Sequence, residues 1–98
     1  MTITRIQNAS SLTLALTGRL ETLTAPELEK VVKEELAGVN ELVFDLTALE
    51  YISSAGLRVL LSAQKIMNAQ GAMKVIGANE IVREVFDITG FSDILTIE

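Results

Sequence analysis

Two adjacent serines, Ser53 and Ser54, are the residues of this sequence whose type and position best fit a chemical role. They stand where an apolar run with helical spacing begins. A serine at a helix start commonly caps it, because its hydroxyl accepts a hydrogen bond from a free backbone N–H. The same position also suits a phosphoserine, since unpaired N–H groups and the helix dipole favour an anion by about 0.3 to 1 kcal/mol. Only one of the two can be the cap, so the other hydroxyl is left free.

Gly56 follows these serines inside the expected first helical turn. Glycine there costs about 0.5 to 1 kcal/mol relative to alanine, so the bare backbone must serve a purpose. Close approach of a neighbouring strand would explain it, and so would close approach of a partner protein. The sequence leaves both explanations open.

The sequence excludes most familiar hydrolase mechanisms, because the chain has no histidine and no cysteine. Disulfides, thiolate nucleophiles, imidazole bases and the usual zinc sites are therefore excluded. Asp45 and Glu50 have the positions of solvated charges, and no phosphate-cradling glycine motif occurs. We expect no catalytic residue, no metal and no cofactor. The remaining enzymatic alternative is a nucleophilic Ser53 or Ser54 activated by a lysine or a carboxylate.

The first half of the chain predicts a hairpin, a helix and a buried strand. Residues 2–7 and 12–17 alternate with a period of two around a polar turn, which is typical of paired strands. Thr24 and Glu27 have the spacing of a capping box, and the apolar residues that follow indicate an amphipathic helix over residues 25–37. The apolar run 41–46 is typical of a strand covered on both faces, and a loop of about seven residues then leads to the serines.

The second half predicts two further helix–strand pairs. Helical spacing extends from Ser54 to Gln70, and short apolar strands are expected over 73–76 and 94–97, with a helix capped by Asn79 between them. The order is β-β-α-β-α-β-α-β, and helices that connect successive strands make those strands parallel. We therefore expect one α/β domain over residues 1–98, with helices packed on a mixed, mostly parallel sheet.

Charge and hydropathy narrow the choice of partners. Thirteen acidic against eight basic residues give a net charge of −5, which opposes binding to nucleic acid or to an anionic membrane. The N-terminus has no apolar stretch of signal-peptide length, and no run is long enough to span a bilayer. We expect a cytoplasmic protein that binds neither nucleic acid nor membrane.

The serine motif resembles that of a known family. Asp45-Leu46, the segment Tyr51 to Leu57 and the segment Gly18 to Glu21 match the pattern of the STAS domains of bacterial anti-sigma factor antagonists, in which a Ser or Thr stands two residues before a Gly at a helix start. The similarity extends over essentially the whole chain. It implies a single STAS domain whose phosphoacceptor is Ser54, with Ser53 as the alternative.

The resemblance also implies further site residues. Glu21 takes the family's acidic loop position, and Asp45 is expected near the same rim of the sheet. Two departures occur: Ser53 replaces the common Asp before the acceptor, and Ala55 replaces the common Ser or Thr after it. The residues implied to bind a partner are Glu21, Tyr51, Ser53, Ser54, Gly56, Leu57 and Arg58.

The mechanism that the resemblance implies is partner switching. The unmodified protein binds an anti-sigma factor that is also a serine kinase, phosphorylation at Ser54 breaks the complex, and a serine phosphatase resets it. Apolar contact is expected from Leu20, Leu23, Tyr51, Ile52 and Leu57, although the same residues are equally suited to the core. An alternative with the same fold is a constitutive scaffold or sensory module that phosphorylation does not control.

Overall fold

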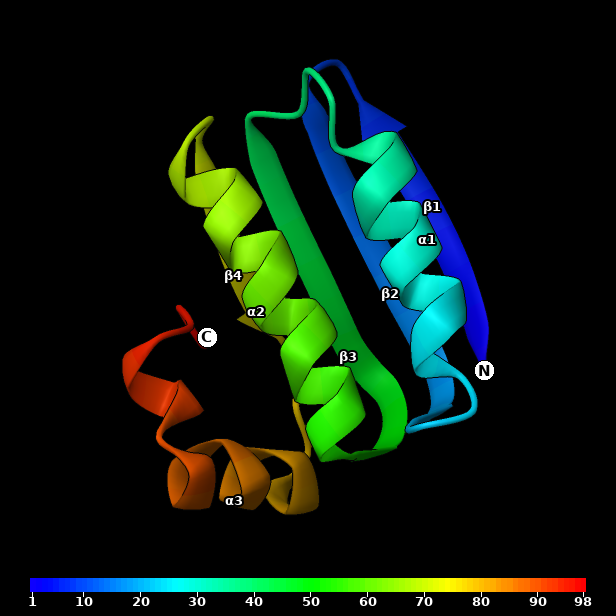
Figure 1. Ribbon diagram of the computed structural model, residues 1–98, viewed down its shortest axis with the longest axis vertical. Coiled ribbons are helices and arrows are strands. Elements are labelled where there is room, and N and C mark those ends of the chain that lie inside the picture. Colours follow the sequence, from blue (N-terminus) through cyan, green and yellow to red (C-terminus); the bar gives the residue numbers. More distant parts are fainter.

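The computed structural model describes residues 1–98 as a four-stranded sheet with three helices (Figure 1). The sheet order is β1-β2-β3-β4, with β1 antiparallel to β2 and the other neighbours parallel. This arrangement confirms the expected α/β fold. The elements in chain order are β1 (Thr2–Asn8), β2 (Ser11–Leu20), α1 (Ala25–Glu35), β3 (Glu41–Ile52), α2 (Ser54–Asn68), β4 (Ala72–Ile76), α3 (Glu80–Thr89) and the short 3-10 helix η1 (Phe91–Asp93).

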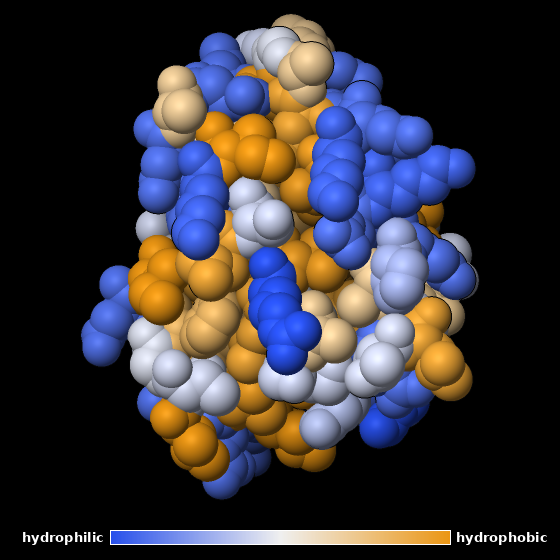
Figure 2. All heavy atoms as spheres, viewed as in Figure 1, coloured by the Kyte–Doolittle hydropathy of each residue, from blue (hydrophilic) through white to orange (hydrophobic).

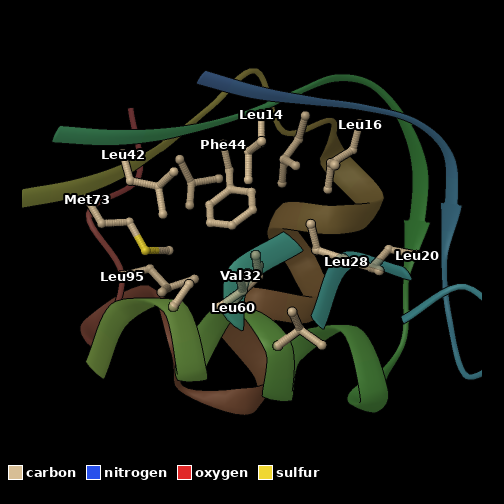
Figure 3. Close-up of a cluster of buried hydrophobic side chains, with 14 of the residues drawn as sticks. Leu14, Leu16, Leu20, Leu28, Val32, Leu42, Phe44, Leu60, Met73 and Leu95 are labelled. Atoms are coloured by element: carbon tan, nitrogen blue, oxygen red, sulfur yellow. The ribbon is translucent and has the colours of Figure 1, made fainter. Parts of the chain in front are cut away.

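The core lies between one face of the sheet and the helices. Figure 1 shows α1 and α2 side by side along that face, with α3 crossing at the end where α2 begins. Successive residues of β2 alternate between this face and the other, and all the leucines of the strand point to this face and are buried. Figure 3 shows the resulting apolar layer, in which side chains from the sheet meet side chains from the helices; the labelled residues are Leu14, Leu16, Leu20, Leu28, Val32, Leu42, Phe44, Leu60, Met73 and Leu95.

Strand β3 is twice as long as the sequence pattern indicates. It spans 12 residues and ends at Ile52, directly before α2, so the expected loop of about seven residues does not exist. Irregular pairing with β2 between Ala15 and Thr17, and again after Gly18, is the reason. These shifts place the buried side chains of the second half three residues apart, at Leu46, Leu49 and Ile52, instead of two.

The closing strand expected over residues 94–97 is present only as one parallel pair between Val75 and Ile97. The Val75 N–H donates to the Thr96 carbonyl at 2.8 Å, and the Glu98 N–H donates to the Val75 carbonyl at 2.9 Å. Leu95, which directly precedes Thr96, is 5% exposed and joins the core. The strand cannot extend further toward the N-terminus, because residues 91–93 form the turn of η1.

Candidate functional site

The two serines lie at the junction of β3 and α2, and their surroundings differ. Ser54 is the first residue of α2 and is exposed. Ser53 is the N-cap residue and is partly buried, but its side chain makes no capping hydrogen bond. The Ser53 Oγ atom is buried and has no hydrogen-bond partner. Of the two hydroxyl-bearing residues, Ser54 is therefore the one presented to solvent.

Gly56 lets the start of α2 approach the ends of β2 and β3. A Cβ atom at Gly56 would lie 2.6 Å from Leu20 Cγ and 2.9 Å from Ile52 Cγ1, which is closer than side chains pack. The Ser53 N–H also donates to the Leu20 carbonyl at 2.9 Å. Of the two explanations that the sequence left open, the approach of a neighbouring strand accounts for this glycine. Its packing fixes where Ser54 sits.

The turn between β2 and α1 is held by Thr24, and not in the way the sequence pattern predicts. The Thr24 hydroxyl donates to the Arg19 carbonyl at 2.8 Å and accepts from the Glu21 N–H at 2.9 Å. It makes no capping bond to α1, so the expected capping box with Glu27 is wrong. The hydroxyl instead closes the turn, because it satisfies two backbone groups that the end of β2 leaves unpaired.

Arg19 connects Glu21 to Tyr51 at this end of the sheet. Its Nε atom lies 3.3 Å from Glu21 Oε2, and its guanidinium carbon lies 4.7 Å from the centroid of the Tyr51 ring. Sequence reasoning did not single out Arg19, because its contact with Tyr51 follows from their pairing across β2 and β3. Tyr51 alternates with the buried Ile52, so this cluster points to the sheet face opposite the helices.

A shallow hollow of about 310 Å³ lies between the first turns of α1 and α2. Arg58, which is exposed, lines it from α2, and Glu29 lines it from α1. Glu29 is paired with Lys33 at 3.0 Å. Ser54 and Arg58 thus lie on the helix side of the molecule, whereas the Arg19–Glu21–Tyr51 cluster lies toward the open face of the sheet. The structure places the expected partner-binding residues at one end but on two sides of it.

Most of the apolar residues expected at the partner surface belong to the core. Leu20 and Ile52 are fully buried, and Leu57 is 4% exposed. Gly56 is buried as well. These residues therefore belong to the core, as the alternative interpretation of the sequence had it. They pack beneath the expected partner surface and are not exposed on it. Leu23 is different, because 83% of it is exposed beside the site.

Asp45 does not lie at the rim where the resemblance put it. It pairs with Ile76 of β4, and seven further residues of β3 follow it. The Thr47 side chain donates to Asp45 Oδ1 at 2.6 Å, and the Thr47 N–H donates to the same atom at 3.0 Å. These two hydrogen bonds lower the pKa of Asp45 below its ordinary value. Asp45 therefore holds β3 together through Thr47 and is not part of the serine site.

No group of three or more acidic, histidine or cysteine side chains is placed to hold a metal ion. No helix has both the length and the apolar character needed to cross a membrane.

Comparison with known proteins identifies the family. A family model described as the STAS domain matches residues 1–98, and the chain belongs to that family. BtrV of Bordetella bronchiseptica, provisionally named an anti-sigma factor antagonist, is 39% identical over 84 residues, covering 84% of this chain and 72% of BtrV. The anti-sigma-B factor antagonist of Bacillus subtilis is 32% identical over 96 residues, covering 93% and 84% of the two chains.

Solved structures share the fold. An anti-sigma factor antagonist from Mycobacterium paratuberculosis superposes with a TM-score of 0.89 at 23% identity, covering 98% of this chain and 83% of the other. SpoIIAA in its unphosphorylated form gives a TM-score of 0.72 at 13% identity, covering 99% and 87%. The phosphorylated form of the Bacillus protein SpoIIAA gives 0.69 at 14%, covering 99% and 91%. At these identities the likeness establishes the fold alone.

Proposed function

We propose that this protein is a cytoplasmic anti-sigma factor antagonist that is controlled by phosphorylation of Ser54. Its unmodified form binds an anti-sigma factor that is also a serine kinase, and so releases the regulator which that factor sequesters. The kinase transfers the γ-phosphoryl group of ATP to Ser54 Oγ, the hydroxyl loses its proton, and ADP leaves. A serine phosphatase hydrolyses the phosphate and restores binding.

The observation that carries this proposal is the exposure of Ser54 as the first residue of α2. A kinase must reach the hydroxyl, and a helix start tolerates the added charge. The names of the relatives support the antagonist function, and SpoIIAA supports the modification, since that protein has been solved with and without phosphate. One phosphate adds about −1.5 to −2 charges, which an apolar interface would have to desolvate at high cost.

Phosphorylation can be tested with the cognate kinase and ATP. Mass spectrometry of the product should place the phosphate on Ser54, and the Ser54→Ala protein should remain unmodified. Ser53→Ala is the matched control, because it removes the neighbouring hydroxyl and should leave the reaction intact. Phosphate on Ser53, or none at all with a kinase that modifies another substrate, would refute the assignment.

Binding tests the switch separately. Ser54→Ala should bind the anti-sigma factor as tightly as the wild-type protein, in the presence or absence of ATP. Ser54→Asp should bind at least ten-fold more weakly, because a carboxylate supplies part of the charge of the phosphate. Equal binding by both variants, measured by isothermal calorimetry, would favour the alternative of a constitutive scaffold or sensory module.

A further inference from the structure

Arg58 differs from the other arginines in having no partner. Arg5 and Arg19 form ion pairs with glutamates, and Arg83 donates to the Ala78 carbonyl. The side chain of Arg58 makes no hydrogen bond and no ion pair, and Arg58 is exposed one helical turn after Ser54. An unpaired guanidinium thus lies close to the hydroxyl that the proposed function modifies.

Helix geometry directs this side chain toward Ser54. Residues four apart on a helix are neighbours, with their Cβ atoms about 5 to 6 Å apart. Side chains on a helix lean toward its N-terminus, so Arg58 covers the turn that begins at Ser54. Ser62 continues the same exposed row one turn later and shares the hollow with Arg58. The guanidinium can therefore reach a group attached to Ser54 Oγ without any change in the backbone.

The acidic groups nearby do not compete for Arg58. Glu29 is the one acidic residue that lines the hollow with it, and Glu29 is paired with Lys33 at 3.0 Å. The first turn of α2 contains no acidic residue. A phosphate on Ser54 would be the strongest acceptor within reach, and the planar guanidinium matches two phosphate oxygens at once.

We infer that Arg58 holds the phosphate of phosphorylated Ser54 within the same molecule. This inference rests on the proposed modification of Ser54 and adds a second element to the switch. Phosphorylation then introduces a dianion. It also engages Arg58, the one unpaired arginine near the start of α2, so that this side chain is no longer available to bind a partner. The bound phosphate is in addition harder for a phosphatase to engage, so Arg58 lengthens the life of the modified state. Arg58 is a positioning residue in this account.

The test uses phosphoserine placed at position 54 during translation, so it does not depend on any kinase. The second pKa of the phosphate is followed by ³¹P NMR in the wild-type background, in Arg58→Gln and in Arg58→Lys. The guanidinium stabilises the dianion, so the pKa in Arg58→Gln should be about 0.3 unit or more above that of the wild type. Arg58→Lys keeps the charge but loses the two-point contact, so its pKa should lie between the other two.

Lys65→Gln is the matched control, because it removes one positive charge from the last turn of the same helix. Lys65 lies 11 residues after Ser54, about 16 Å along the helix axis and beyond the screening length at physiological salt. The second pKa of the Ser54 phosphate in Lys65→Gln should equal that in the wild-type background. Equal values in wild type, Arg58→Gln and Lys65→Gln would overturn the inference. That outcome would leave the proposed function standing, whereas failure of the kinase to modify Ser54 would leave this measurement unaffected.

Discussion

Ser53 occupies a capping position without acting as a cap. Its backbone is extended as in an N-cap residue, yet its Oγ atom is buried with no hydrogen-bond partner. An unsatisfied buried hydroxyl costs about 1 to 3 kcal/mol, which offsets what serine normally contributes at a helix start. Asn79 at the start of α3 is the contrasting case, because its side chain accepts from the Val82 N–H at 2.8 Å and donates to the Leu49 carbonyl at 3.1 Å.

This contrast predicts opposite effects for two similar substitutions. Ser53→Ala should leave the free energy of unfolding unchanged or raise it by up to about 1 kcal/mol, because it removes an unpaired hydroxyl. Asn79→Ala should lower it by about 1 to 2 kcal/mol, because it removes a working cap. Urea unfolding followed by far-UV circular dichroism measures both. Equal losses in the two variants would show that the Ser53 hydroxyl is bonded in solution.

The close packing around Gly56 predicts that a side chain at this position destabilises the fold. Gly56→Ala should lower the free energy of unfolding by about 1 to 3 kcal/mol, because the added methyl group meets Leu20 and Ile52. Ser54→Ala on the exposed side of the same turn should change it by less than about 0.5 kcal/mol. The double variant with Leu20→Ala should lose less than the sum of the single losses, since the truncated leucine makes room. A Gly56→Ala protein as stable as the wild type would contradict this packing.

At the scale of elements, β3 is the strand that connects the sheet to the site. It pairs with β4 only as far as Asp45, and its second half pairs with β2 alone, through irregular register. Asp45 and Thr47 lie where this change occurs, and Asp45 accepts a hydrogen bond from the Thr47 N–H, a backbone group that a regular ladder would pair, and a second one from the Thr47 hydroxyl. The ionised form of Asp45 thus stabilises the part of β3 that leads to α2.

The lowered pKa of Asp45 predicts how stability depends on pH. Its contribution is present above the pKa of the unfolded chain and is lost as the pH falls through the lower pKa of the folded protein. Wild-type stability should therefore decline below about pH 4, and Asp45→Asn should be less stable at pH 7 and decline less steeply. Urea unfolding between pH 2.5 and 7 tests this. Parallel curves for the two proteins would show that Asp45 does not contribute.

At the scale of the whole molecule, one end combines the exposed Ser54 with exposed apolar side chains. Leu23, Ile81 and Ile88 are 83%, 57% and 77% exposed, and they come from the turn before α1 and from α3. Figure 1 places both segments at the end where α2 begins, and Figure 2 shows orange apolar spheres over α3 at that end. Ile6 is 58% exposed but pairs with Thr13, near the hairpin turn at the opposite end.

This distribution predicts which exposed apolar residue matters for binding. Leu23→Ser should leave the free energy of unfolding nearly unchanged and weaken binding to the anti-sigma factor about 5- to 30-fold, as expected for an apolar interface anchor. Ile6→Ser removes a comparable side chain from the far end and should not alter binding. Calorimetric titration of both variants decides the matter. A loss of affinity in Ile6→Ser alone would place the interface on the sheet instead.

The sequence by itself determined the order of the elements and the position of the serines at a helix start, because hydrophobic period and helix signals act between residues close in the chain. Strand β3 was predicted too short, because shifts in its pairing with β2 break the period of two in its buried side chains. Only the tertiary structure decided that Ser54 is the exposed serine, that the Leu20 side chain packs against the backbone of Gly56, and that Arg19 stacks on Tyr51. Each of these depends on contacts between segments some 30 residues apart, which local pattern does not contain.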